Sequence, residues 1–130
     1  MFSIIKILPN LGDIVWLYPP EKIGIKPRPG LIVGVSKNKH EVIVAFGTSQ
    51  KTNKLYPSEF LISKEDGDDV FGLSGLSYDT KFDLARTCTL PFTTEFFGKA
   101  PRKHNIPHPK LGSIHIKYYP AMFKAKEHSK

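Results

Sequence analysis

The sequence predicts a small, mainly β protein with one folded domain. A chain of 130 residues is long enough to bury one core. Hydrophobic residues make up 40% of it and include nine Phe and five Tyr, which favours a packed interior over disorder. Eleven Pro and ten Gly divide the chain into short segments. Such a division favours many short strands and turns over long helices.

The first half of the chain contains three predicted strands. Residues 12–18 (GDIVWLY) follow a Gly turn and end at a pair of prolines. Residues 30–35 (GLIVGV) form a nearly continuous apolar run, which predicts a strand buried on both faces. Residues 41–46 (EVIVAF) form the next strand. Because the turn-like residues 37–40 separate the second strand from the third, we expect these two to form a hairpin.

The second half of the chain is expected to continue with short strands and turns. Residues 55–56 and 59–62 are predicted as two strands around Pro57, and the acidic residues 64–69 as a turn. Alternation of apolar and polar residues predicts another strand at 80–84.

The last elements are shorter and less regular. Residues 87–90 are predicted as a separate strand, and residues 93–97 as a helical turn with a Thr cap. Residues 98–110, which combine three prolines with basic side chains, indicate an extended arm. A short helix is expected within 116–127, where Pro120 limits its starting point.

The basic charge lies at one end of the chain. Residues 1–97 carry eleven Lys or Arg and eleven Asp or Glu, whereas residues 98–130 carry eight basic side chains against Glu127 alone, so this end holds the whole net charge of +7. We therefore divide the chain into a β domain at 1–97 and a basic, proline-containing C-terminal extension at 98–130, packed on or trailing from that domain. Such an extension attracts polyanions, or serves only as a solvated, solubilising segment.

Cysteine usage and the first residues indicate the compartment. Cys88 is the single cysteine, so no intramolecular disulfide forms, which favours a reducing, cytoplasmic location. Residues 1–9 are apolar but too short to cross a bilayer, and they lack a basic start and a cleavage site. We expect neither a signal peptide nor membrane association.

Several segments, in this order and spacing, resemble a known family. GDIVW at residues 12–16, followed after about a dozen residues by RPGLIV at 28–33, is similar to the opening of the MazF/PemK toxins. VAFGTS at 44–49 resembles the strand of that family that ends in Thr or Ser, and TKFDL at 80–84 followed by LPF at 90–92 is similar to a divergent PemK-like branch. The resemblance covers residues 12–92.

The resemblance implies a fold, an activity and partners. The fold would be a five- to seven-stranded SH3-like barrel of the MazF/PemK (CcdB/Kid) type with short helical elements, commonly a homodimer. The activity would be that of a type II toxin, an endoribonuclease that cuts single-stranded RNA without metal or other cofactor. The partner would be a cognate antitoxin.

The resemblance also implies site residues. In the family, the arginine before the proline and the Thr or Ser after the later strand lie together in the RNA cleft, which indicates Arg28 and Thr48 here. Asp83 completes the candidate catalytic set, matching an Arg-x-Asp pair of some relatives only approximately. The candidate RNA-binding side chains are basic or amide groups: Gln50, Lys51, Lys54, Lys81, Arg86, Arg102 and Lys103.

The chemistry of RNA cleavage gives each group a role. The 2′-hydroxyl must lose a proton, and the negative charge that develops on phosphate must be stabilised. The fork of Arg28 suits charge stabilisation. The Thr48 hydroxyl can bond the phosphate or the 2′ oxygen, or merely complete a turn. Asp83 is either the base or a partner of Lys81 two positions away.

The histidines of the sequence give only weak support for a catalytic or metal-binding role. Residues 19–27 contain no His, although some relatives carry one before the Arg-Pro pair. His104 and His108 are four residues apart, but Pro107 argues against the helix that a metal would need there, so no metal site is expected.

Two other functions remain open from the sequence. One is a barrel of the same fold that binds nucleic acid or protein without cutting. The other is a purely protein-binding module, with apolar surface at residues 19–20 or 118–119 as the contact. Trp16 is expected in the core rather than on a base-stacking surface.

Overall fold

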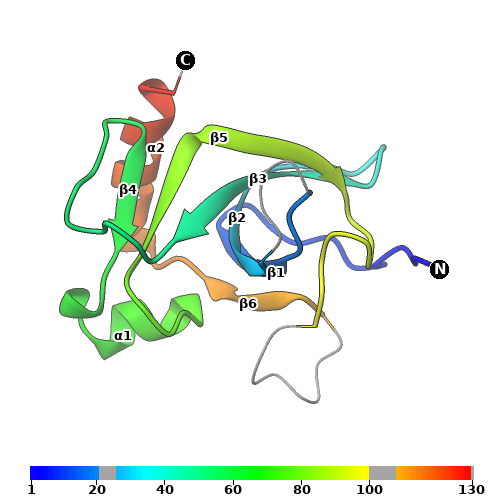
Figure 1. The fold of residues 1–130 in the computed structure, drawn as a ribbon, viewed down its shortest axis with the longest axis horizontal. Coiled ribbons are helices and arrows are strands. Elements are labelled where there is room, and N and C mark those ends of the chain that lie inside the picture. Colours follow the sequence, from blue (N-terminus) through cyan, green and yellow to red (C-terminus); the bar gives the residue numbers. More distant parts are fainter. Residues whose placement is uncertain (21–25, 100–107, 130) are drawn as a thin grey trace.

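The computed structural model describes residues 1–20, 26–99 and 108–129. Within them, six strands form one curled antiparallel sheet in the order β4-β5-β3-β2-β1-β6 (Figure 1). The mainly β class predicted from the sequence is confirmed. The strands are β1 (Asp13–Leu17), β2 (Arg28–Ser36), β3 (Glu41–Thr48), β4 (Glu59–Ile62), β5 (Thr80–Pro91) and β6 (Lys110–Ser113). The helices are short: η1 (Lys64–Asp66), α1 (Asp68–Phe71), η2 (Gly72–Ser74), η3 (Ile116–Tyr118) and α2 (Tyr119–Glu127).

The predicted strands of the first half are confirmed. β2 and β3 form the expected hairpin, with Ser36 opposite Glu41. Leu31 and Ile32 are both completely buried although neighbours on a strand point to opposite faces, so the apolar run is a strand covered on both sides. β2 begins at Arg28, two residues before the predicted start, because Pro29 pairs with Trp16 of β1.

Three predictions for the second half are wrong. Residues 55–56 are not a strand, and Tyr56 is the first residue of a turn in which Glu59 N donates to Tyr56 O at 2.9 Å. The two strands predicted at 80–84 and 87–90 are one strand, β5, interrupted only by a bulge. Residues 64–69 form η1 and the start of α1 instead of a simple turn, since Ser63 caps η1 through Glu65 N.

The predictions for the short helical segments agree with the structure. Residues 93–97 make a single turn, in which Phe97 N donates to Thr93 O at 3.1 Å and Thr93 Oγ1 accepts from Glu95 N at 3.3 Å. The expected C-terminal helix is present as η3 and α2, with Pro120 in its first turn. This position suits proline because the first N–H groups of a helix have no partner within it. None of the helices in the described ranges is long and apolar enough to cross a membrane.

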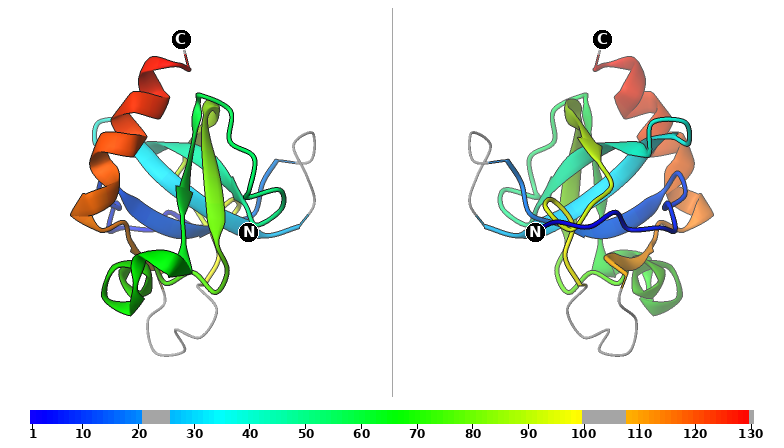
Figure 2. Two further views of the ribbon diagram at one scale, coloured as in Figure 1. Left: turned by 90° about the vertical axis from the view of Figure 1, so that its left-hand side faces the viewer. Right: turned by 90° about the vertical axis from the view of Figure 1, so that its right-hand side faces the viewer.

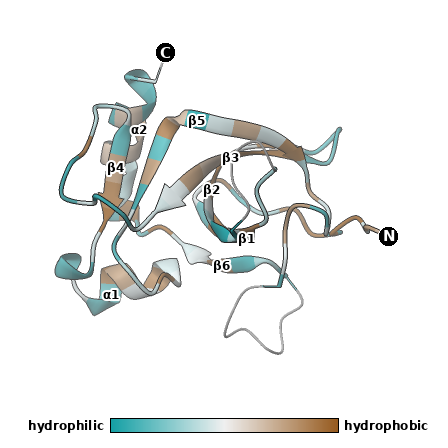
Figure 3. Ribbon diagram, in the orientation of Figure 1, coloured by the Kyte–Doolittle hydropathy of each residue, from teal (hydrophilic) through white to brown (hydrophobic). Residues whose placement is uncertain are grey.

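Hydrophobic residues pack on both faces of the sheet. Along β1, Ile14 belongs to one cluster and Val15 to the other. Along β5, hydrophobic residues are instead separated by hydrophilic ones, which appear as bands in Figure 3. The first cluster includes Met122 of α2, which lies beside β4 and β5 (Figures 1 and 2). The second includes Phe92 and is bordered by the N-terminal segment, where Ile5 N donates to Phe92 O at 3.1 Å.

The C-terminal extension contributes to this fold. β6 pairs with β1, and the carboxylate of Asp13 holds the two together by accepting from Ser113 Oγ at 2.8 Å and pairing with Lys110 Nζ at 3.5 Å. The Asp of the GDIV motif is therefore structural. Tyr118 is buried, so the apolar surface suggested at residues 118–119 is largely inside the molecule, and only Tyr119 is part of a half-exposed surface.

A polar contact fixes the start of the C-terminal helix. Lys117 Nζ donates to Asp66 Oδ1 at 2.8 Å, and Tyr118 OH donates to Asp66 Oδ2. The hydrogen bond from Lys117, followed by that from Tyr118, lowers the pKa of Asp66 below its ordinary value of 3.8. Burial, together with the bond to Asp66, raises the pKa of Tyr118 to about 12. The contact joins η1 to η3 across about fifty residues of chain.

Candidate functional site

Two cavities meet at the ends of β2 and β3. One, of about 470 Å³, is walled by Trp16 and Tyr78, and we call it the aromatic cavity. The other, of about 430 Å³, contains Glu59 and Lys81, and we call it the charged cavity. Both are lined by the same four residues: Arg28, Gly47, Thr48 and Gln50. The two cavities therefore adjoin, and we refer to them together as the cleft.

Strand register brings Arg28 and Thr48 together. Gly30 of β2 lies opposite Phe46 of β3. This is the last pair of the hairpin ladder, and Arg28, the first residue of β2, and Thr48, the last residue of β3, each lie two residues beyond it at the same end of the hairpin. The structure thus unites in one cleft the two residues on which the sequence prediction depends.

One hydrogen-bond donor of the Arg28 side chain lacks a partner among the described residues. Its Nε atom is buried, and among the described residues no hydrogen-bond acceptor lies within reach of it. A buried N–H without an acceptor is unfavourable by about 1–3 kcal/mol.

The Thr48 hydroxyl accepts one hydrogen bond and can still donate another. Its Oγ1 accepts from Gln50 N at 3.2 Å, which is the turn-completing role that the sequence left open. A hydroxyl that accepts one bond still carries its own proton to donate. The turn contact therefore orients Thr48 without using up its donor.

The charged cavity contains a buried ion pair. Lys81 Nζ lies 3.2 Å from Glu59 Oε2, and the two side chains are only 8% and 7% exposed. Lys81 Nζ also donates to Lys54 O at 3.0 Å. The partner of Lys81 is thus Glu59 of the neighbouring strand rather than Asp83 of its own strand. Its predicted contact with RNA stays a prediction.

Asp83 and Arg86 lie in a bulge of β5 and line the charged cavity. Gly47 of β3 pairs with Phe82 and Ala45 with Thr87, so the intervening residues of β5 leave the ladder with β3. Asp83 Oδ1 accepts from Ser58 Oγ at 2.8 Å and from Ala85 N at 2.9 Å, while Oδ2 lies 3.9 Å from Arg86 Nε. Both side chains line the charged cavity, and that of Arg86 is 82% exposed.

The other predicted RNA-binding residues divide into three groups. Gln50 and Lys51 line the cleft, Lys51 with a left-handed φ of 52°. Lys54 lines neither cavity, and its carbonyl oxygen holds Lys81. Arg102 and Lys103 lie outside the described residues, as does His104.

His108 has a local structural contact. Its Nε2 lies 2.9 Å from Ile7 O, and its Nδ1 accepts from Lys110 N at 3.1 Å. Across residues 1–20, 26–99 and 108–129, the structure contains no group of three His, Cys, Asp or Glu side chains placed to hold a metal ion.

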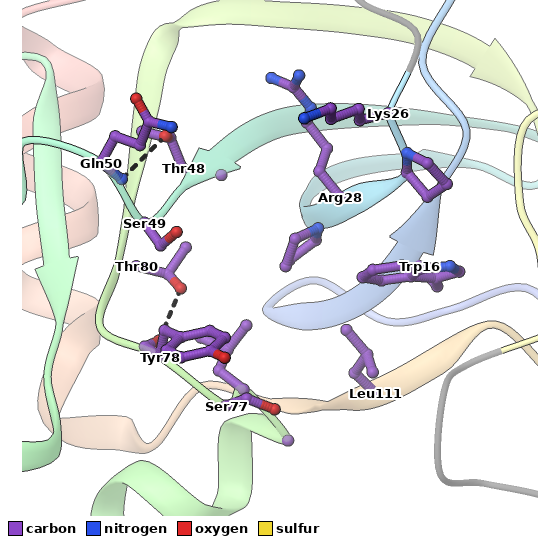
Figure 4. Close-up of a pocket in the computed structure, with 15 residues that line it drawn as sticks. Trp16, Lys26, Arg28, Thr48, Ser49, Gln50, Ser77, Tyr78, Thr80 and Leu111 are labelled. Carbon is purple, nitrogen blue, oxygen red and sulfur yellow. Dashed lines mark hydrogen bonds between the residues drawn. The ribbon is translucent and has the colours of Figure 1, made fainter.

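Sequence reasoning missed most of the aromatic cavity. Trp16 does pack against the core, as expected, but it is half-buried and also lines this cavity. Tyr78 and Lys26 were not singled out, and Figure 4 shows both with Trp16 around a central open space. The only available signal was position: Lys26 stands two residues before Arg28, and Tyr78 two residues before β5.

Two glycines allow the segment before β5 to approach β6. A Cβ at Gly75, where φ is +71°, would lie 2.1 Å from Leu111 O, and one at Gly112 would lie 2.2 Å from Leu73 O. Only glycine fits such backbone contacts without a shift. The close approach places Leu76, Ser77 and Tyr78 along the cavity wall beside Leu111.

The fold is similar to that of a solved endoribonuclease. That protein, from a mycobacterial species and determined in complex with its cognate antitoxin, superposes with a TM-score of 0.57 over 93% of this chain and 94% of its own, at 14% sequence identity. No family model and no curated protein matches the chain. The likeness shows that the sheet and helices described above have the fold of that endoribonuclease.

Proposed function

We propose that the chain is a MazF/PemK-like toxin, an endoribonuclease that cuts single-stranded RNA without a metal ion. One observation carries the proposal: Arg28 and Thr48 line one cleft in a fold shared with an endoribonuclease. As in the resemblance drawn from the sequence, the partners would be a cognate antitoxin and a second copy of the chain, in the cytoplasm.

The groups in the cleft suit cleavage through the ribose 2′-hydroxyl. The 2′ oxygen forms a bond to phosphorus, and the bond from phosphorus to the 5′ oxygen breaks. This leaves a 2′,3′-cyclic phosphate and a 5′-hydroxyl, which takes its proton from solvent. Asp83 would accept the 2′ proton through Oδ2, which lies 3.9 Å from Arg86 Nε.

Arg28 and Thr48 would act on the phosphate. Arg28 would balance the charge that develops on the phosphate oxygens, since its guanidinium keeps its proton and donates through a fork. The position of Arg28 in the lining of both cavities supports this role. Thr48 would donate its remaining proton to a phosphate oxygen.

The test is incubation of mixed RNA with the purified, folded chain in the presence of a chelator. We expect fragments with cyclic phosphate and 5′-hydroxyl ends. Arg28→Ala should lower the cleavage rate by about 10²- to 10³-fold, the usual effect of removing a charge-stabilising donor. The control is Lys37→Ala, which removes an exposed positive charge from the turn after β2. An intact RNA pool after treatment with the folded, antitoxin-free wild type would reject the proposal.

A non-catalytic barrel that binds nucleic acid is the second candidate. The observation in its favour is that Glu59 already neutralises Lys81, which removes one free charge from the cleft. It predicts binding that weakens with salt, without cleavage. Removing the basic extension is not a suitable test, because β6 and α2 belong to the fold. Lys124 and Lys126, exposed on α2, can instead be changed to Gln together.

A further inference from the structure

The aromatic cavity differs in chemistry from the rest of the cleft. Of the described residues that line it, two are cationic (Lys26 and Arg28) and none is Asp or Glu. Apolar surface comes from Trp16, Leu76 and Leu111. An apolar chamber with cations at one side fits a flat, uncharged group joined to a phosphate.

Two aromatic side chains occupy different walls of this cavity. Tyr78 is 68% exposed, and Lys64 Nζ lies 5.6 Å from the centre of its ring. A ligand stacked on Tyr78 would therefore take the other face of the ring. Trp16 lies on the β1 side of the open space (Figure 4). Bases of single-stranded RNA commonly stack on such rings, and every base offers a face for it.

The backbone of both walls is held by hydrogen bonds. The backbone N–H of Trp16 donates to Pro109 O at 2.8 Å, and its backbone carbonyl accepts from Gly98 N at 3.1 Å. The opposite wall is braced by the buried Ser74, whose Oγ donates to Phe71 O at 2.6 Å and accepts from Leu76 N at 3.2 Å. A preformed wall lowers the ordering cost of binding.

We propose that the aromatic cavity binds one nucleobase of single-stranded RNA, adjacent to the phosphate that Arg28 holds. This inference rests on the proposed function, because it takes Arg28 as the phosphate-binding group. Lys26 attracts the same backbone from the neighbouring position. The positive charge alone would suit either RNA or an acidic peptide. The aromatic walls favour RNA, and the peptide is therefore an alternative outcome of the test.

The experiment uses the one tryptophan of the chain as its reporter. The fluorescence of Trp16 is followed while each of four nucleoside 5′-monophosphates is added to the full-length protein. Ribose 5-phosphate, which has the phosphate and sugar but no base, is the ligand control. We expect at least one nucleotide to change the emission saturably, and ribose 5-phosphate to leave it unchanged.

Variants show whether Tyr78 takes part. Tyr78→Ala should raise the Kd of the bound nucleotide about 5- to 20-fold, as expected for loss of one stacking ring. Tyr78→Phe keeps the ring and should stay within about two-fold of wild type. Phe123→Ala, which removes an exposed ring from α2 outside both cavities, is the matched control and should have no effect.

The outcomes separate this inference from the proposed function. If the chain cuts RNA but ribose 5-phosphate acts as strongly as the nucleotides, or Tyr78→Ala leaves the Kd unchanged, the base site is rejected and the nuclease stands. If nucleotides bind as described but RNA is never cut, the base site stands and the nuclease is rejected. An emission change with a tryptophan-free Glu/Leu peptide and with no nucleotide would overturn the inference in favour of a protein partner.

Discussion

The two cavities that meet at Arg28 and Thr48 differ in their charged residues: one contains both acidic and basic side chains, and the other contains basic side chains only among its described lining residues. In the charged cavity Lys81 is paired with Glu59, and Asp83 lies near Arg86. In the aromatic cavity two cations face apolar and aromatic walls, with no carboxylate among the described lining residues. The Glu59–Lys81 pair joins β4 to β5 inside the charged cavity. The aromatic cavity has no carboxylate among its described lining residues to pair with its cations.

The largest expected effect tests the structural role of the charged cavity. Glu59→Ala leaves the Lys81 ammonium buried without its counter-charge, which should lower the free energy of unfolding by about 3–5 kcal/mol. Denaturant titration measures this loss. Glu65→Ala, at an exposed position of η1, should stay within about 0.5 kcal/mol of wild type. Equal stabilities of the two variants would show that the pair does not brace the cleft.

The next effect lies where the two cavities join. Thr48→Val keeps the shape of the side chain and removes its hydroxyl, so RNA cleavage should slow about ten-fold while the fold persists. Thr48→Ser retains the hydroxyl and should keep most of the activity. Cleavage assays at saturating RNA provide the measurement. Full activity in Thr48→Val would restrict Thr48 to completing the turn with Gln50.

Asp66 provides a reference pair that lines neither cavity. Its pKa is lower in the folded protein than in the unfolded chain, so its contribution to stability is present above about pH 4 and is lost as the pH falls through the folded value. Asp66→Asn should cost about 1 kcal/mol at pH 7, and less as the pH is lowered. Unfolding measured from pH 7 to pH 3 tests this. An equal cost at both ends of the range would contradict it.

The smallest effect is expected at the rim of the charged cavity. Arg86→Ala should change stability by less than about 0.5 kcal/mol, because its guanidinium is 82% exposed and 3.9 Å from Asp83. Thermal unfolding of Arg86→Ala and Glu59→Ala, measured together, compares the stability lost in the two variants. A cost similar to that of Glu59→Ala would remove the distinction between the buried and the exposed pair.

Much of the fold could be predicted because local pattern and final structure agree. The apolar run at 30–35 and its turn determined the β2–β3 hairpin, and this hairpin brings Arg28 and Thr48 to one end. β5 was divided in two because Ala85 and Arg86 interrupt the alternation. That interruption is a bulge, which sequence periodicity does not distinguish from the end of a strand.

The rest of the site depends on contacts between distant segments. Lys81 and Asp83 share a face of one strand, so pairing between them was a reasonable expectation. The observed partner, Glu59, enters only because β4 pairs with β5. The aromatic cavity needs Trp16, Tyr78 and Leu111 from three regions of the chain, and no local pattern connects them.

The contact between Gly75 and Gly112 bears on how such a protein can diversify. Neither position has room for a methyl group against the backbone it faces. A larger residue at either place would move the Tyr78 segment away from β6 and widen the chamber between them. Under the proposed function, a change at either glycine would let the cavity admit a larger base without altering any of the residues proposed to contact RNA.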